Sequence, residues 1–441
     1  MFSLLSASFE SDYKIYGQIQ NQTILSPVVT DSNLKVELVA SNFDFPTSME
    51  FVGNDDIILL EKNTGNVYRI VNGNVTGPLI HIDVSFKDER GLLGVAVSKT
   101  EGSNNDNKDN KGDPYVFLYY TQCAKILGKK NSQNCANYVY RYEFSIEDNK
   151  FINPKLILNL SALPGPSHNG GVLEMDKDNN IYIITGDLQS TAFNQNQSGY
   201  DTQAQNIING SAPDGRSGIL RVTEDGGALD NGVLGNRYPL NLYYAYGIKN
   251  SFGMGFDPIT DNLWDTENGP QFGDEINLVE PGFNSGWEKV QGIWKLNETR
   301  EKDGIFKKSN QQVKFEDFDD NGQYSGPEFV WDKTVAPTAL IFLDSDELGK
   351  DYQNDMFVGS VKNGTIYHFE LNEDRKSLSL QGDLADLLLN KQDDVSKIRF
   401  GENFGIITDL EVGPDGYLYV VSGFRGTDQG SIYRIVPNSR G

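Results

Sequence analysis

The stretch that decides the fold is residues 410–421, which read Leu-Glu-Val-Gly-Pro-Asp-Gly-Tyr-Leu-Tyr-Val-Val. Two short apolar runs flank a Gly-Pro-Asp-Gly turn, and their β-branched and aromatic residues favour strands. Asp and Gly suit the turn because they tolerate positive φ and hydrogen-bond their own backbone. The stretch therefore predicts two antiparallel strands joined by a tight turn.

The same hairpin pattern occurs six times along the chain. The other copies are residues 49–60, 94–120, 173–184, 254–264 and 341–358. Three copies precede a further strand of shared form, namely residues 65–70, 364–369 and 430–435. Six copies over 441 residues give about 70 residues each, which is long for a four-stranded propeller blade, so the excess is assigned to loops. We predict an all-β fold, a six-bladed β-propeller with long inter-strand loops.

A tandem of β-sandwiches is the competing fold, but it does not account for the repeated third strand. Helical periodicity is nearly absent, with residues 202–208 and 384–388 the only candidates. The polar run 101–113 lies between two predicted strands, so we interpret it as a surface loop. No linker divides the chain, and the predicted organisation is an N-terminal segment (1–36), one propeller (37–436) and a C-terminal tail (437–441).

Composition narrows the possible partners. The chain has 38 Lys and Arg against 62 Asp and Glu, a formal net charge of −24. Nucleic acids and anionic membrane surfaces both require a basic face, so neither is an expected partner. Three His and two Cys are too few to favour a Cys/His zinc site or a multi-His metal site. No apolar run approaches the roughly 18 residues that a membrane-spanning helix needs.

Several features favour an extracytoplasmic location. Residues 1–8 lack a basic region and are too short for a full signal peptide, although they are compatible with the tail of one. Seven Asn-x-Ser/Thr sequences are potential glycosylation sites, which together with the acidic composition favour secretion. They begin at Asn21, Asn74, Asn159, Asn196, Asn209, Asn297 and Asn363.

The two cysteines lie at the ends of two strand-like runs. Cys123 follows the run 115–121, Cys135 precedes the run 138–144, and the segment between them is polar. A disulfide would close this hairpin and stabilise the fold by about 3 kcal/mol. The alternative is two unrelated buried thiols, but the hairpin and the expected oxidising compartment favour the disulfide.

His168 is the first candidate for chemistry. It lies in Ser-His-Asn-Gly-Gly (167–171), after a Pro-Gly-Pro turn and before a predicted strand. Histidine is the usual general base at neutral pH, and the flanking glycines allow close approach of a ligand. The alternative is a surface or capping histidine.

A second candidate lies in residues 264–277, where Glu267, Asp274 and Glu275 surround a Gly269-Pro270 turn. Carboxylates and turn carbonyls are hard oxygen ligands that suit Ca²⁺. The alternative is a solvated acidic loop, which is common in so acidic a chain.

Three further stretches, residues 89–94, 244–250 and 360–364, are ordinary loops when taken singly. Together, however, five motifs occur in an order that resembles the soluble glucose/sorbosone dehydrogenase family over residues 37–436. They are Glu-Arg-Gly-Leu-Leu-Gly, His-x-Gly-Gly, Tyr-x-x-Gly-x-Lys-Asn, Glu-Asn-Gly-Pro…Asp-Glu-Ile-Asn and Val-Ala-Pro. The resemblance implies a six-bladed propeller that uses pyrroloquinoline quinone (PQQ) and calcium to oxidise a sugar and passes electrons to an external acceptor.

The resemblance also implies roles for individual residues. His168 matches the catalytic base, and Asp187 matches the pocket floor. The positions that match cofactor contacts are Glu89, Lys249, Asn250, Thr334 and Lys362. The positions that match the calcium turn and its support, or a second calcium site, are Gly269, Pro270, Asp274 and Glu275.

The chain departs from the family pattern at three places. Lys249 replaces an arginine, Ile406 and Thr408 stand where two cofactor-binding arginines are expected, and Leu188 stands where a glutamine is expected. Lysine lacks the planar fork with which arginine binds a carboxylate through two hydrogen bonds, so we predict weakened PQQ binding. Tight binding would instead indicate that Arg90 or Arg216 from neighbouring loops replaces the missing arginines. The alternatives are a non-enzymatic, calcium-stabilised propeller that binds a glycan or protein, and a metal-dependent lactonase-type hydrolase.

Overall fold

The structure is a computed structural model, which describes residues 25–98, 113–125, 133–189, 201–229, 231–296, 313–425 and 428–438. Strands dominate these residues, and the helical segments among them are short 3₁₀ turns. They are η1 (Gln203–Gln205), η2 (Leu240–Leu242), η3 (Lys350–Tyr352), η4 (Lys362–Gly364), η5 (Gly382–Leu384) and η6 (Val395–Lys397). Within the described ranges, no helix has the length and apolar character needed for a membrane crossing.

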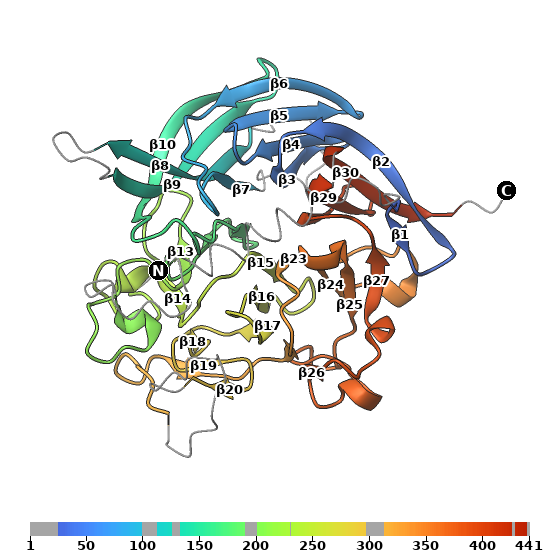
Figure 1. Cartoon of the computed structure of the whole chain (residues 1–441). Coiled ribbons are helices and arrows are strands. Elements are labelled where there is room, and N and C mark those ends of the chain that lie inside the picture. Colours follow the sequence, from blue (N-terminus) through green and yellow to red (C-terminus); the bar gives the residue numbers. More distant parts are fainter. Residues whose placement is uncertain are drawn as a thin grey trace, which may run out of the picture.

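Six sheets of four or more strands stand around a central axis in the described part of the chain (Figure 1). The first sheet consists of β3 (Pro46–Gly53), β4 (Asp56–Glu61), β5 (Asn66–Val71) and β6 (Asn74–His81). The second consists of β7 (Leu92–Val97), β8 (Tyr115–Lys125), β9 (Gln133–Ser145) and β10 (Lys150–Ser161). The third consists of β11 (Leu173–Met175), β12 (Ile181–Thr185), β13 (Gly218–Val222) and β14 (Tyr243–Tyr246), and it is extended by β18 (Phe283–Asn284) and β21 (Gln323–Tyr324).

The other three sheets complete the ring. The fourth consists of β15 (Gly253–Phe256), β16 (Leu263–Glu267), β17 (Asp274–Val279) and β22 (Phe329–Trp331), and it is extended by β26 (Leu388–Leu389). The fifth consists of β23 (Pro337–Phe342), β24 (Met356–Ser360), β25 (Ile366–Phe369) and β27 (Arg399–Glu402), and it is extended by β1 (Val28–Val29). The sixth consists of β28 (Ile407–Val412), β29 (Leu418–Arg425), β30 (Asp428–Pro437) and β2 (Leu34–Phe43). A small hairpin, β19 (Val290–Gln291) and β20 (Trp294–Lys295), stands apart.

The predicted propeller is confirmed, and the repeat explains it. Each of the six hairpin copies supplies the first two strands of one blade, as β28 and β29 do for residues 410–421. The three recurrent third strands are β5, β25 and β30. The first strands of neighbouring blades contact one another around the axis, from β3 through β7, β11, β15 and β23 to β28 and back to β3.

The ring is closed by strands from distant parts of the sequence. In the last blade β2 pairs antiparallel with β30, so that Val36 faces Ile435 (Figure 1). This blade combines a strand from the start of the propeller with strands from its end. Main-chain hydrogen bonds therefore close the ring in addition to the packing between blades.

The core lies between adjacent blades. Ile58 of β4 and Leu118 of β8 are fully buried in one cluster, which joins the first and second blades. Trp331 of β22 and Phe369 of β25 belong to another cluster, which joins the fourth and fifth blades. Because both faces of most blades are covered, their strands read as nearly continuous apolar runs in the sequence.

The predicted disulfide is confirmed. Cys123 of β8 and Cys135 of β9 lie directly opposite each other and are bonded. The bond closes an extension of the second blade, and the intervening residues 126–132 lie outside the described ranges.

Candidate functional site

The topology brings the predicted site residues to one end of the ring. Because strands alternate in direction within each blade, the loops after the second and fourth strands all emerge at the same end. These loops carry every predicted site residue except the β17 residues Asp274 and Glu275, of which Asp274 begins its strand at the same end. The loops after the first strands, which form the tight turns of the repeat, lie at the opposite end.

His168 and Asp187 form the centre of the site. His168 Nδ1 lies 2.6 Å from Asp187 Oδ1, and the Asp187 carboxylate also accepts hydrogen bonds from Gln189 N and from Trp287 Nε1, at 2.9 and 2.8 Å. Burial alone would raise the pKa of Asp187, but the charge and hydrogen bond of His168, with Lys249 and the Gln189 N–H, outweigh it and hold that pKa below its usual value. An ionised Asp187 accepts only, so the proton between the two groups sits on His168 Nδ1.

The backbone around His168 is held in an unusual conformation. His168 has φ +60°, a left-handed value that is uncommon for residues other than Gly. Its main-chain N–H donates to the carboxylate of Glu89, which also accepts from Asn250 Nδ2 at 3.3 Å. Gly186 allows the main chains at His168 and Lys249 to lie this close to it, because a Cβ on residue 186 would lie 2.5 Å from His168 O and 2.7 Å from Lys249 O.

Lys249 and Asn250 line the same space. The Lys249 ammonium lies 3.4 Å from His168 Nε2, donates to Asn268 O at 3.1 Å and is 5.8 Å from the centre of the Trp287 ring. Both residues are almost fully buried, and the Asn250 Oδ1 atom has no hydrogen-bond partner in the described part of the chain. An unpaired buried acceptor of this kind is costly unless a ligand supplies a donor.

The Gly269-Pro270 turn lies beside Lys249 and is held by Asp274. Asp274 Oδ1 accepts from Gly269 N, and Oδ2 accepts from the N–H groups of Val335 and Ala336. Burial raises the pKa of Asp274 to about 6, although these backbone bonds act against the shift. Asp274 thus braces the turn against the Val-Ala-Pro segment.

Glu275 is turned away from that turn, because adjacent residues of a strand point to opposite faces. Its carboxylate accepts from Gln291 Nε2 at 2.9 Å and from Gly292 N. Burial, with the neighbouring Glu267 carboxylate, raises its pKa well above the usual value. In the described ranges, no three His, Cys, Asp or Glu side chains gather in a metal-binding cluster.

Thr334 and Lys362 form a pair near the Val-Ala-Pro segment. Lys362 Nζ donates to Thr334 Oγ1 at 2.6 Å, and the exposed lysine charge acts on Asp274. Contacts therefore bring together one group of predicted positions, Glu89, His168, Asp187, Lys249 and Asn250, and a second group, Gly269, Asp274, Thr334 and Lys362, whereas Glu275 lies on the far face of its strand.

For two of the three departures the structure shows what the residues present contact. Thr408 turns its hydroxyl to Pro46 O at 2.9 Å. Ile406 offers only a main-chain carbonyl, which accepts from Gly423 N. Leu188 is buried with φ +57°, and the next residue, Gln189, binds Asp187 through its backbone.

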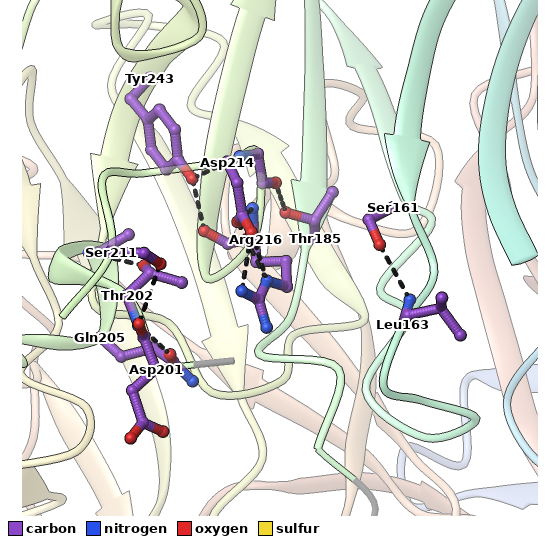
Figure 2. Close-up of polar contacts among 12 residues, drawn as sticks. Ser161, Leu163, Thr185, Asp201, Thr202, Gln205, Ser211, Asp214, Arg216 and Tyr243 are labelled. Carbon is purple, nitrogen blue, oxygen red and sulfur yellow. Dashed lines mark hydrogen bonds and ion pairs between the residues drawn. The ribbon is translucent and has the colours of Figure 1, made fainter. Parts of the chain in front are cut away.

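The two substitute cations differ. Arg216 is buried and forms a bidentate ion pair with Asp214, so its charge is neutralised within its own loop (Figure 2). That loop packs beneath the site, since the Thr185 hydroxyl donates to Gly215 O and Tyr243 Oη donates to Arg216 O. Arg90 is also buried but forms no ion pair among the described residues.

Sequence reasoning missed Trp287, and it named Glu267 only as one of the carboxylates around the candidate calcium turn. Trp287 anchors Asp187 from a distance of 100 residues, and Glu267 Oε1 accepts from Lys249 N at 2.8 Å. Burial and the nearby Asp265 raise the pKa of Glu267 to about 8. Nothing in the sequence around Trp287 marked it as a site residue.

Comparison with known proteins identifies the family. A sequence model of the family described as "Glucose / Sorbosone dehydrogenase" matches residues 43–434. The aldose sugar dehydrogenase YliI of Escherichia coli is 26% identical over 416 residues, covering 92% of this chain and 94% of that protein. Quinoprotein glucose dehydrogenase B of Acinetobacter calcoaceticus is 28% identical over 276 residues, covering 59% and 53%.

A solved structure shares the fold. The PQQ-bound aldose sugar dehydrogenase of Streptomyces coelicolor superposes with a TM-score of 0.59 at 18% identity, covering 93% of this chain and all of that one. At this identity the likeness supports the propeller fold alone.

Proposed function

Since the chain belongs to the glucose/sorbosone dehydrogenase family, we propose that it oxidises an aldose at its anomeric carbon, with PQQ and calcium as cofactors and an external electron acceptor. The observation that carries the proposal is the His168–Asp187 pair, fixed at the loop end of the ring beside Lys249 and Asn250. This pair favours an enzyme over a propeller that only binds a ligand.

His168 has the arrangement of a general base. Its Nδ1–H donates a hydrogen bond to Asp187, so Nε2 is the ring atom whose lone pair can accept a proton. We assign it the proton of the sugar's anomeric hydroxyl. The Lys249 ammonium, 3.4 Å from Nε2, places a positive charge next to the oxygen that gives up this proton.

The residues present fit the cofactors, with a weaker grip than the family pattern. Lys249, Lys362 and Thr334 supply cations and a hydroxyl, and Asn250 has an unpaired buried oxygen. Gly269 and Pro270 would offer their carbonyls to calcium. When bound, PQQ accepts the two electrons of the oxidation and calcium acts as a Lewis acid.

The test is to add PQQ and Ca²⁺ to purified protein and to measure sugar-dependent dye reduction and PQQ binding by titration calorimetry. We expect turnover with an aldose and a Kd in the micromolar range, equivalent to about −8 kcal/mol. Absence of binding heat and of a quinone absorbance shift up to millimolar PQQ would overturn the proposal.

We also propose that the protein works outside the cytoplasm. The disulfide supports an oxidising compartment, and Asn74, Asn159 and Asn209 are exposed. Asn21, Asn196 and Asn297, and the side chain of Asn363, lie outside the described residues. Cell fractionation and intact-mass measurement test this, and a cytoplasmic, reduced and unmodified protein would contradict it.

A further inference from the structure

Arg90 is buried without the partners that a buried charge normally has. The residue is 5% exposed and forms no ion pair within the described ranges. Its Nη2 atom donates to Ala162 O at 2.6 Å, its Nη1 atom contacts Cys123 Sγ at 3.6 Å, and its Nε atom has no partner there. Burying a guanidinium with so few acceptors is costly, so its retention calls for a reason other than stability.

The contacts of Arg90 connect the disulfide hairpin to the segment that leads to His168. Ala162 is fully buried, its N–H donates to Cys135 O at 3.1 Å, and its carbonyl accepts from Arg90. The main chain at Ala162 is therefore held from both sides. The residues on either side of Ala162 are also bonded to each other, since Leu163 N donates to Ser161 Oγ at 3.2 Å (Figure 2). This hydrogen bond constrains the main chain where it leaves β10.

The guanidinium also lies against the middle of this segment. A Cβ on Gly165 would stand 2.5 Å from Arg90 Nη2 and 2.7 Å from the main-chain oxygen of Ala162, and the second of these contacts favours glycine here. Gly165 N in turn donates to Leu188 O at 2.6 Å, next to Asp187. Residues 162–168 are thus wedged between Arg90 and the loop that carries the partner of His168.

The residue before Arg90 holds the other end of the segment. Glu89 accepts from the main-chain N–H of His168, where φ is +60°. A left-handed backbone at a non-glycine residue persists only when its surroundings impose it. The adjacent side chains of Glu89 and Arg90 therefore fix the two ends of residues 162–168.

We propose that Arg90 is a positioning residue, which clamps residues 162–168 against the Cys123–Cys135 hairpin and so keeps His168 in register with Asp187. The inference rests on the proposed function for the role of His168 as the base. Because a misplacement of about 1 Å can cost on the order of 100-fold in rate, the clamp has a measurable consequence.

The test combines turnover with the NMR signal of the His168 ring. The chain has three histidines, so ¹⁵N-histidine labelling gives few signals, and His168→Gln assigns the one of interest. In the holoenzyme we expect Arg90→Met to lower kcat by roughly 10- to 100-fold. In the same variant the hydrogen-bonded Nδ1–H signal should broaden or disappear. Arg90→Lys, which can still reach Ala162 O, should recover part of both.

Arg375→Met is the matched control. Arg375 is a partly buried arginine, and it donates to the main-chain carbonyl of Asn354 at 2.6 Å and to Asp257. Its loss should lower stability at least as much, but leave the His168 signal and kcat per folded molecule unchanged.

An unchanged His168 signal and kcat in Arg90→Met would overturn the inference. If that variant does not fold, the double variant Cys123→Ser/Cys135→Ser takes its place, and an unaltered His168 signal there would equally overturn it. If the wild type oxidises no sugar, the proposed function fails, while the NMR comparison still decides whether Arg90 positions His168.

Discussion

His168 depends on side chains that come from three separate loops. Glu89, Asp187 and Lys249 each reach it across at least 19 residues of sequence, and each contacts a different atom: the main-chain N–H, Nδ1 and Nε2. The ring is thereby fixed in orientation and in tautomer. Chemistry at Nε2 should therefore be sensitive to loss of the imidazole itself and much less to changes in surface residues.

We expect His168→Ala to lower turnover by roughly 10²- to 10⁴-fold while the fold persists, because it removes the proton acceptor. His368→Ala is the control, since His368 also pairs with a carboxylate, Asp355 at 2.8 Å, but on another blade. Steady-state kinetics and thermal melts of both variants provide the measurement. Equal activity per folded molecule in His168→Ala and wild type would make His168 structural.

At this scale the sequence predicted the residues better than their partners. His168 could be named from its own Gly-flanked motif, whereas Lys249 and Asn250 were named only because five motifs in order resemble the family. Trp287 was not, because its bond to Asp187 arises only when the third blade folds. Neighbouring positions on one strand, such as Asp274 and Glu275, also looked equivalent until the pleat separated them.

At the scale of elements, strand β2 closes the ring by pairing with β30. Its inward residues include Phe43, which is 3% exposed, whereas Leu38 on the same strand is 59% exposed. We expect Phe43→Ala to lower the free energy of unfolding by about 3–5 kcal/mol, and Leu38→Ala to change it by less than about 0.5 kcal/mol. Denaturant titration measures both, and similar losses would show that β2 is not packed as described.

The turn at Gly269-Pro270 is the element expected to bind calcium. Its supporting carboxylate, Asp274, is already satisfied by three main-chain N–H groups, so the turn keeps its shape by itself. An ion bound only in the folded state adds stability by mass action. We expect EGTA to lower the Tm by several degrees, and readdition of Ca²⁺ to restore it. A Tm that is indifferent to EGTA would remove the metal from this turn.

At the scale of the whole molecule, the propeller buries carboxylates inside its ring. Burial raises the pKa of Asp265 on β16 to about 7, and it does the same for Asp409 on β28. The unfolded chain releases these protons near pH 4, so the folded state binds more protons between about pH 4 and pH 7. The stabilisation from the protonated forms is present below pH 4 and is lost as the pH rises to 7.

We therefore expect Asp265→Asn to flatten the fall in unfolding free energy between pH 4 and pH 7, by about 1.4 kcal/mol for each unit of pKa shift removed. Asp261→Asn, at an exposed carboxylate, is the control. Denaturant melts at several pH values supply the comparison. A wild-type slope retained in Asp265→Asn would mean that this group does not titrate in that range.

The overall architecture was the part most accessible from sequence. Each of the six hairpins shows two short apolar runs separated by a polar turn or loop, a pattern that can be recognised from sequence alone. The two-residue strands β1, β18, β21 and β26, which extend three of the sheets, were invisible because so short a segment has no periodicity. They are defined by neighbours that the sequence does not place beside them.

The pairing of β2 with β30 also constrains how the chain matures on the ribosome. Residues 34–43 are translated almost 400 residues before their partner, residues 428–437. Until then the nascent protein is an open arc with two unpaired sheet edges, which are sites where chains associate wrongly. The last blade, and with it the closed ring, can therefore form only after residues 428–437 have been translated.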